Sequence, residues 1–415
     1  METLQEQLTA LRRRIARINR KYSGATPART PPQPERALGR FIEELMSGEV
    51  VCTAYGRHFE TEKVWAPHRR YGSVGISDLV ELPEDLLDTL SEGAIAGASP
   101  RTWAFLDTET TGLPGGTETR AFLIGVGSID AAGFRLRQFF LRDYSEERSL
   151  LARLAEYLAQ FDVLITYNGK AYDQPLLETR FRMVGARHPF DRLRHLDLLF
   201  GARRLWKLRL ENCRLVNLEQ QILGVERHGD LPGEMIPYYY FDYLRTRQAI
   251  RLVPIFHHNA MDIVSLACLT AIVPGAFRSP EEAGLRHGAD LIGLARHLKR
   301  GRPEEALRVF RRAADLGLPD HLLFPTMWEV GRMEKRLGRP DCALAAFREL
   351  AEARNPYRAR AFEELAKHYE HQERDYAKAL EMTRSALALG ETPPLRRREA
   401  RLSARVARLG GQVRS

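Results

Sequence analysis

The sequence is short of cysteine and has no long apolar run. Its 415 residues include only four widely separated cysteines, Cys52, Cys213, Cys268 and Cys342. This spacing excludes a disulfide framework or a zinc ribbon and indicates reduced thiols in a cytoplasmic protein. No apolar run approaches the roughly 20 residues of a membrane-spanning helix. The first residues also lack the basic-then-apolar order of a secretory signal, so we expect no membrane association.

What the sequence does contain is an ordinary globular composition with a basic balance. Hydrophobic residues make up 44% and charged residues 28%, and the length predicts two or three domains. The formal net charge is +9, and arginine supplies most of the positive charge. Because guanidinium groups pair well with phosphate, this balance favours nucleic acid as a partner. A solvated basic surface is the alternative.

The first hundred residues divide into three segments. Residues 1–23 place apolar side chains at heptad spacing with arginines opposite, which predicts a basic amphipathic helix that docks on protein or acts as a basic arm. Residues 24–35 are a proline-rich linker. Residues 36–100 form an N-terminal elaboration of the next domain, with helices predicted at 37–46 and 83–90 and strands at 50–55 and 63–65.

Residues 101–275 have the pattern of an α/β domain. Strands are predicted at 102–107, 121–128, 134–141 and 163–167, the first three joined as a meander by short turns that contain glycine. Helices are predicted at 146–160, 174–184, 215–223 and 259–269, and residues 195–199 also look helical. This order predicts a mixed sheet with helices on its faces.

Residues 285–410 predict a domain of helical repeats. The phrase that begins at Gly301 recurs at Gly338, with a weaker third copy near Arg374. The equivalent alanines Ala306, Ala343 and Ala379 are 37 and 36 residues apart. A tetratricopeptide unit repeats about every 34 residues, so short insertions between units are required.

Two acidic residues end the first strand of the α/β region. Asp107 and Glu109 are two positions apart, so their side chains share one face of the strand. Two carboxylates held so close repel each other unless a cation neutralises them. Hard oxygen ligands favour Mg²⁺ or Mn²⁺, and the pair therefore predicts a metal site.

Further candidates for this site come later in the chain. Asp173 follows a strand and a glycine turn at the start of a helix, where it is also suited to cap the helix. His258 and Asp262 are four residues apart and share a face of a predicted helix. Each of these elements has an ordinary structural explanation when taken alone.

Together the motifs resemble those of the DEDD-type 3′→5′ exonucleases of the ribonuclease H-like superfamily. The first motif is Asp107-x-Glu109, and the second runs from Asn168 to Asp173 with Tyr172 in place of the usual Phe. The third places a histidine before Asp262. The phrase from His258 onward, together with helical repeats after the nuclease region, resembles the YprB-like bacterial branch with C-terminal tetratricopeptide repeats.

The resemblance implies a ribonuclease H-like, DnaQ-like fold and hydrolysis of phosphodiester bonds with two divalent cations, Mg²⁺ or Mn²⁺. It implies metal ligation by four carboxylates, with His258 as general base and His257 as the alternative. The ligands are Asp107, Glu109, Asp173 and Asp262. The implied contacts with the substrate come from Thr108, Thr110, Thr111, Gly112, Leu113, Asn168 and Lys170.

The resemblance also implies DNA as substrate, a context of DNA repair and a helicase or other repair protein bound to the repeats. An exoribonuclease that trims RNA, and a non-catalytic adaptor that binds nucleic acid, are the alternatives. The aromatic residues 238–241 either stack on single-stranded bases or belong to the core. We interpret Asp197 as a structural support and not a ligand.

Overall fold

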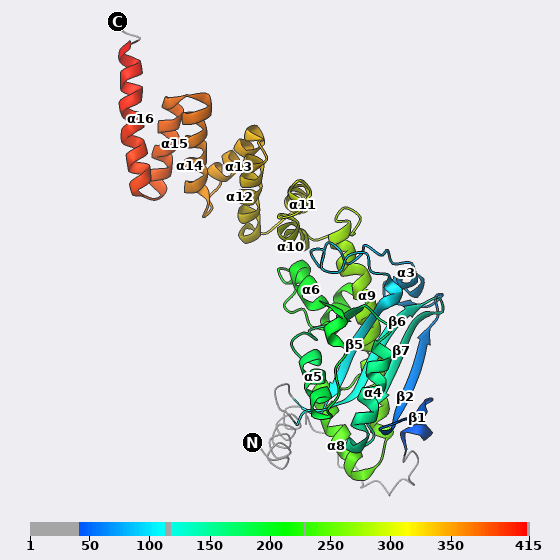
Figure 1. Ribbon diagram of the computed structural model, residues 1–415. Coiled ribbons are helices and arrows are strands. Elements are labelled where there is room, and N and C mark those ends of the chain that lie inside the picture. Colours follow the sequence, from blue (N-terminus) through cyan, green and yellow to red (C-terminus); the bar gives the residue numbers. More distant parts are fainter. Residues whose placement is uncertain (1–40, 113–117, 228, 413–415) are drawn as a thin grey trace, which may run out of the picture. The chain divides into compact units, whose positions relative to one another are not determined.

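The computed structural model describes residues 41–112, 118–227 and 229–412 (Figure 1). The helix predicted at residues 1–23 and the linker at 24–35 lie outside the described residues. Two compact units make up the described chain. The first comprises the residues up to Leu199 together with Arg214–Ala271, and the second comprises Phe200–Cys213 and the residues from Ile272 onward.

The first unit contains a seven-stranded mixed sheet in the order β1-β2-β7-β6-β5-β8-β9. Along the sheet, the neighbouring strands from β1 through β2, β7 and β6 to β5 pair in antiparallel fashion, whereas β5, β8 and β9 pair in parallel. The expected mixed sheet is therefore confirmed, including the β5-β6-β7 meander. The strands are β1 Glu49–Thr53, β2 Gly56–Trp65, β5 Trp103–Thr110, β6 Ala121–Asp130, β7 Gly133–Phe140, β8 Val163–Thr166 and β9 Arg194–Asp197. A separate two-stranded ribbon consists of β3 Arg70–Tyr71 and β4 Val74–Gly75.

Helices connect the strands and surround the sheet (Figure 1). Those of the first unit are α2 Ile42–Leu45, α3 Ile76–Val80, α4 Glu147–Leu158, α5 Asp173–Met183, α7 Leu215–Leu218 and α8 Ile236–Thr246. A π-helical turn, Glu219–Leu223, continues α7. Two helices pass from the first unit into the second, α6 Leu198–Trp206 and α9 Val253–Arg278.

Both faces of β6 are covered, which explains why nine of its ten residues are buried. Gly125 and Gly127 face α9, because a Cβ atom added at these glycines would lie 2.2 and 2.7 Å from side-chain atoms of Ile263. Ser128 faces the opposite way, and its hydroxyl lies 3.5 Å from the Tyr157 hydroxyl of α4. The two small residues therefore allow α9 to lie directly on the sheet.

Two local predictions are wrong. Residues 83–90 form a series of turns and not a helix, and left-handed backbone at Glu92 and Gly93 follows them. Residues 195–197 belong to β9, and α6 begins only at Leu198. Leu196 pairs with Ile165 of β8, so pairing within the sheet outweighs the local helical preference.

Helix α9 is the one helix of the described residues that is long and apolar enough to cross a membrane. Within the protein, however, 72% of its most apolar stretch is buried. Its apolar residues pack on the sheet, and the same helix carries His258 and Asp262. These properties make α9 a core helix.

The second unit is helical, as the sequence predicts. Its helices are α10 Gly288–Leu298, α11 Pro303–Asp315, α12 Asp320–Arg336, α13 Pro340–Glu352, α14 Arg358–His368, α15 Tyr376–Leu389 and α16 Pro393–Gln412. The repeated phrases fall in α11, α13 and α15, and their alanines Ala306, Ala343 and Ala379 are buried. A small residue at each of these positions lets neighbouring helices approach closely.

Candidate metal centre

The site lies where β5 extends beyond its parallel neighbour. Phe105 of β5 is paired with Ile165, and β8 ends one residue later at Thr166. Asp107 and Glu109 therefore lie past the carboxyl end of β8, the edge at which sites collect in α/β sheets. Glu109 is 9% exposed and is followed by an irregularity in the pairing with β6.

Asp107 ends a row of residues that crosses four strands. Thr61, Gln138, Gly125 and Asp107 are successive register partners on β2, β7, β6 and β5. Directly paired residues share a face, so all four residues face α9. Because Gly125 has no side chain, Asn259 of α9 occupies the space above it, where an added Cβ would lie 2.3 Å from Asn259 Oδ1.

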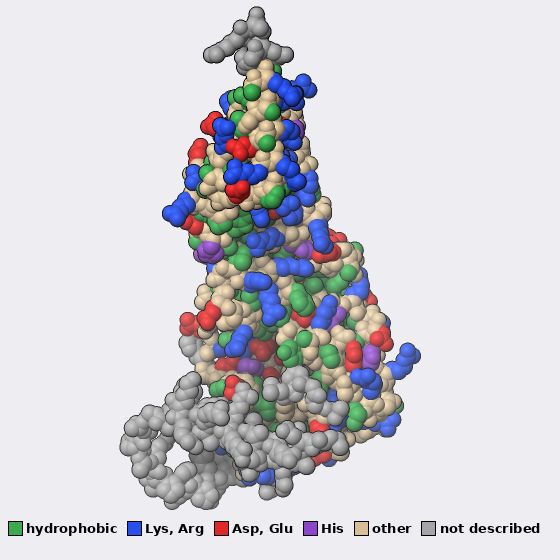
Figure 2. All heavy atoms as spheres, turned by 90° about the vertical axis from the view of Figure 1, so that its left-hand side faces the viewer, with side chains coloured by type: hydrophobic (Ala, Val, Ile, Leu, Met, Phe, Trp, Pro, Cys, Tyr) green, Lys and Arg blue, Asp and Glu red, His purple; other side chains and the backbone are tan. Residues whose placement is uncertain are grey.

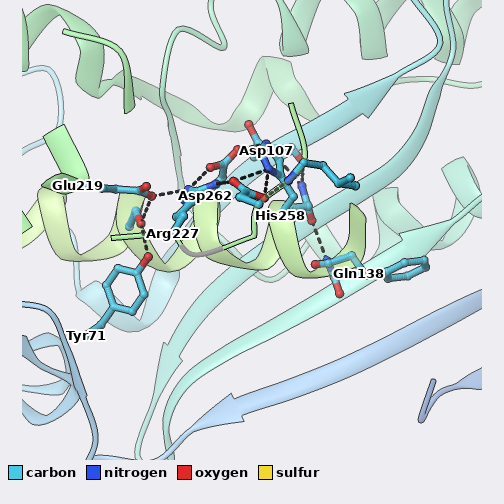
Figure 3. Close-up of polar contacts among 12 residues, drawn as sticks. Tyr71, Asp107, Gln138, Glu219, Arg227, His258 and Asp262 are labelled. Atoms are coloured by element: carbon cyan, nitrogen blue, oxygen red, sulfur yellow. Dashed lines mark hydrogen bonds and ion pairs between the residues drawn. The ribbon is translucent and has the colours of Figure 1, made fainter. Parts of the chain in front are cut away.

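A buried chain of hydrogen bonds follows this row to Asp107 (Figure 3). Thr61 donates to Gln138 Oε1 at 3.1 Å, and Gln138 Nε2 donates to Asn259 Oδ1 at 2.9 Å. Asn259 Nδ2 then donates to Asp107 Oδ2 at 3.0 Å. Gln138 also donates to the Phe256 carbonyl, which fixes the orientation of its amide. The chain holds one carboxylate oxygen of Asp107 in place.

Asp173 reaches the site from the first turn of α5. Thr108 on β5 donates a hydrogen bond of 2.5 Å to its Oδ1. The preceding loop turns through Asn168, whose φ is +68°, and is held by Asp197, which accepts from the backbone N–H groups of Asn168 and Lys170 at 2.8 and 3.2 Å. Asp197 therefore supports the loop that presents Asp173.

His258 lies between two carboxylates. Its Nδ1 is 2.8 and 3.0 Å from the two oxygens of Asp230, and its Nε2 is 3.5 Å from Asp262 Oδ2. Burial lowers the pKa of His258, but the charges of Asp262 and Glu109 and the hydrogen bond with Asp230 outweigh it, so the pKa is raised. His257, in contrast, is exposed, and its pKa is lowered, first by partial burial and then by Lys63.

Arg227 joins Asp262 to the rest of the first unit (Figure 3). Its side chain is 5% exposed, and its guanidinium pairs with Asp262, with Glu219 and, at 3.1 Å, with Asp230. Glu219 accepts from the Ser265 hydroxyl, which lies 2.8 Å from the Tyr71 hydroxyl. One cation therefore holds both Asp262 and the carboxylate that orients His258.

The carboxylates have the properties of a metal site. Ligand atoms of Glu109, His258 and Asp262 lie within 4.8 Å of one another. Burial, then the charges of Asp262, Asp173 and Glu109, raise the pKa of Asp107 well above its ordinary value. Burial also raises the pKa values of Glu109 and Asp173. Because a cation would relieve this repulsion and oxygen donors predominate, the residues fit a divalent metal such as Mg²⁺ or Mn²⁺.

The residues expected to contact substrate lie around these carboxylates, but several are committed to local structure. Thr108 bonds Asp173, Thr110 donates to the Gly112 carbonyl at 2.8 Å, and Thr111 accepts from the Arg120 N–H at 2.9 Å. Asn168 is half-buried and the side chain of Lys170 is exposed. Leu113 lies outside the described residues.

The aromatic residues 238–241 of α8 differ in burial, which bears on whether they stack on bases or belong to the core. Tyr240 is fully buried, its ring stacks on Phe122 at a centroid distance of 4.0 Å, and its hydroxyl donates to the Leu141 carbonyl. It therefore belongs to the core. Tyr238 and Tyr239 are half-buried.

Sequence reasoning missed four residues that hold the site: Asn259, Arg227, Asp230 and Glu219. Asn259 immediately follows the two histidines, and its place beside a predicted catalytic histidine was the one available signal. Arg227 and Asp230 lie between predicted elements and Glu219 lies in a predicted helix, and none of the three belongs to a recognisable motif. Their partners become apparent only when α9 is packed on the sheet.

Comparison with known families agrees with this geometry. Residues 104–273 match the family RNase_H_2, described as the RNase_H superfamily. The matched region contains the sheet from β5 onward and most of α9, and it is an RNase H-like domain, a class whose members are usually nucleases that use divalent metals.

Among individual proteins, the chain is similar to the uncharacterized protein YprB of Bacillus subtilis (strain 168). The two are 29% identical over 350 residues, which is 82% of either chain. Among solved structures, one match is the family B DNA polymerase from the archaeon Pyrobaculum calidifontis, at 16% identity and a TM-score of 0.33. That match covers 49% of this chain, and the chain spans 30% of the polymerase.

Proposed function

We propose that the protein is a DEDD-type, metal-dependent 3′→5′ exonuclease that hydrolyses DNA. The observation that carries this proposal is the convergence of Asp107, Glu109, Asp173 and Asp262 beside His258. These residues come from β5, α5 and α9, and they meet at one edge of an RNase H-like sheet. An adaptor that never performed hydrolysis would have no physical reason to keep so many buried carboxylates together.

Each residue has a role that follows from its position. Asp107, Glu109, Asp173 and Asp262 would hold two divalent cations, which activate the attacking water and stabilise charge on the phosphate. His258 would take the proton of the water at Nε2, because Asp230 holds Nδ1. The raised pKa of His258 suits proton uptake near neutral pH.

The polarity and the substrate rest on the resemblance of residues 107–113 and 168–173 to the exonuclease motifs. The turn that begins at Thr110 would bind the 3′-terminal nucleotide. The helical second unit would be a tetratricopeptide-like domain, and a repair protein such as a helicase would bind it.

The direct test is degradation of three substrates labelled at the 5′ end: single-stranded DNA, duplex DNA and RNA of matched sequence. With Mn²⁺ or Mg²⁺ we expect a ladder of shortened DNA products, and with EDTA none. Asp107→Asn should lower the rate about 10³-fold or more, because the side chain stays similar in size but loses the charge that binds metal. The matched control is Asp191→Asn, whose side chain is 84% exposed.

Each outcome decides one part of the proposal. Full activity in Asp107→Asn would overturn the site assignment. Immediate release of the labelled nucleotide would indicate the opposite polarity. Degradation of RNA but not of DNA would establish the exoribonuclease alternative.

One observation favours the non-catalytic adaptor as the second candidate. Arg227 pairs with Asp262, so a protein cation already neutralises one of the expected metal ligands. Titration with Mn²⁺, followed by calorimetry, separates the two functions. If wild type binds no Mn²⁺ but Arg227→Gln does, the guanidinium replaces the metal and the adaptor is correct. Binding of Mn²⁺ by wild type favours the exonuclease.

A further inference from the structure

The chain distributes its charge unevenly along its length. Residues 41–284 contain 27 lysines and arginines against 33 aspartates and glutamates. Residues 285–415 contain 27 lysines and arginines against 18 acidic residues. The region with the RNase H-like domain is therefore acidic, and long-range electrostatic attraction to a polyanion must come from elsewhere in the chain.

The helical unit has a hollow where positive side chains gather. A cavity of about 300 Å³ is lined by Lys299, just past α10, and by Trp328, Arg332, Lys335 and Arg336 of α12. We call this cavity the α12 groove. In the view of Figure 2, many Lys and Arg side chains lie on the visible face of the helical unit.

The lysines and the arginines of the groove differ in their partners. Lys299 pairs with Glu329, and Lys335 pairs with Glu364 at 2.6 Å, so the two glutamates that line the groove are neutralised. Arg332 and Arg336 are exposed, and no ion pair joins either to a carboxylate of the described residues. Two positive charges of the groove are thus available to an anionic ligand.

The arrangement of these groups selects the ligand. Arg332 and Arg336 are four residues apart, so they lie on one face of α12 about 6 Å apart along its axis. Trp328 presents a half-buried ring to the same cavity. Cations in a row beside an aromatic ring are features of single-strand binding sites, in which backbone phosphates meet the cations and a base stacks on the ring.

We propose that the α12 groove binds the backbone of single-stranded nucleic acid. This proposal deepens the proposed function, because it gives the acidic nuclease domain a separate site that holds the polyanionic substrate. It also assigns the helical unit to the substrate and not only to protein partners.

The test is binding of fluorescein-labelled oligothymidylate, followed by fluorescence anisotropy in EDTA, where hydrolysis is absent. The double variant Arg332→Glu/Arg336→Glu should bind about tenfold more weakly or worse. The slope of log K against log salt should become shallower by about 1.4, because each phosphate contact with a single strand contributes about 0.7.

The matched control is Arg397→Glu/Arg408→Glu on α16. Both arginines are exposed, lie in the same unit and lie outside the groove, so the change in net charge is identical. Control binding close to wild type supports the groove. An equal loss in both variants would show diffuse electrostatic attraction and overturn the proposal. Wild-type affinity in the groove variant would also overturn it, and would indicate that the groove binds a different anionic ligand, such as an acidic peptide.

A second measurement separates this proposal from the proposed function. Hydrolysis of a chromogenic nucleotide ester, which has a single phosphodiester, should have an unchanged kcat in the groove variant. On long single strands its KM should rise while kcat stays constant. If the groove variant loses binding in EDTA and the wild-type protein hydrolyses no substrate, the groove proposal stands and the exonuclease proposal is rejected. A fall in kcat on the ester would overturn the groove as a separate binding site.

Discussion

The two units differ in how their buried charges are arranged. The first unit buries charges: Glu109, Asp173 and Glu219 are at most 9% exposed, and Arg227 is 5% exposed. The second unit also buries carboxylates, but each of them pairs with an arginine of the same unit: Asp290 with Arg209, Glu334 with Arg311 and Glu370 with Arg401. Its core cluster is apolar, built around residues such as Phe347. Buried charges cost free energy of folding unless they are compensated. Carboxylates that lie close together, such as Asp107 and Glu109, therefore cost the first unit stability, whereas the second unit pairs its buried carboxylates and gains stability from packing.

We expect the largest effect confined to one unit, a loss of the rate of hydrolysis, from His258→Asn in the first unit. Its imidazole touches Asp230 and approaches Asp262, and loss of a general base lowers a rate by about 10² to 10⁴-fold. The rate is measured on labelled single strands with saturating Mn²⁺. The thermal transition of the second unit should not move.

His257→Asn is the matched control, because this neighbour is exposed. We expect nearly wild-type rates from it. A larger loss in His257→Asn than in His258→Asn would assign the base to His257 and reject the geometry around Asp230.

The elements of both units that depend on a local sequence pattern could be predicted from the sequence. Alternation and glycine turns are enough to indicate β5, β6 and β7, and the 37- and 36-residue spacing of alanines is enough to indicate repeated helices. The residues that hold the site could not be predicted in this way. Asn259 meets Asp107 across 152 positions, and Arg227 meets Asp262 across 35. These pairs depend on strand register and on how closely α9 approaches Gly125, which no local pattern encodes.

In the second unit, Phe347→Ala should have a large effect on stability alone. Phe347 is 2% exposed and packs on Trp328 and against Gly331. Truncation of a buried Phe costs about 3–5 kcal/mol. In urea, the transition of the second unit should move to lower concentration, while Mn²⁺ affinity stays constant. A fall in Mn²⁺ affinity in this variant would contradict the view that metal binding depends on the first unit alone.

A methyl group at Gly125 should couple packing to chemistry in the first unit. The Cβ of Gly125→Ala would lie 2.2 Å from Ile263 and 2.3 Å from Asn259, so α9 must move away from the sheet. We expect a loss of about 1–3 kcal/mol in stability and a weaker Mn²⁺ site, because Asn259 holds Asp107.

The control is Gly275→Ala, in α9, the helix that packs on Gly125. Among the described residues, no atom apart from its chain neighbours and the nearby backbone of α9 lies within 4 Å of the position of its Cβ, and alanine favours a helix by about 1 kcal/mol. This variant should be at least as stable as wild type. Unchanged Mn²⁺ affinity in Gly125→Ala would show that Asp107 does not need the contact with Asn259.

The smallest effect we predict is a pH dependence confined to the first unit. The pKa values of Asp107 and Glu109 are raised by burial and by neighbouring charges, so the folded state binds more protons than the unfolded state. Stability in EDTA should therefore fall as the pH rises from about 6 to 8, and His258, whose pKa is also raised, acts in the same direction. We expect the melting temperature of the first unit to fall by a few degrees, about 2–4 °C for each kcal/mol lost. Saturating Mn²⁺ should remove this slope, because the cation replaces the protons, and the transition of the second unit should show no such response. A slope that persists with Mn²⁺ would mean that the buried carboxylates do not bind the metal.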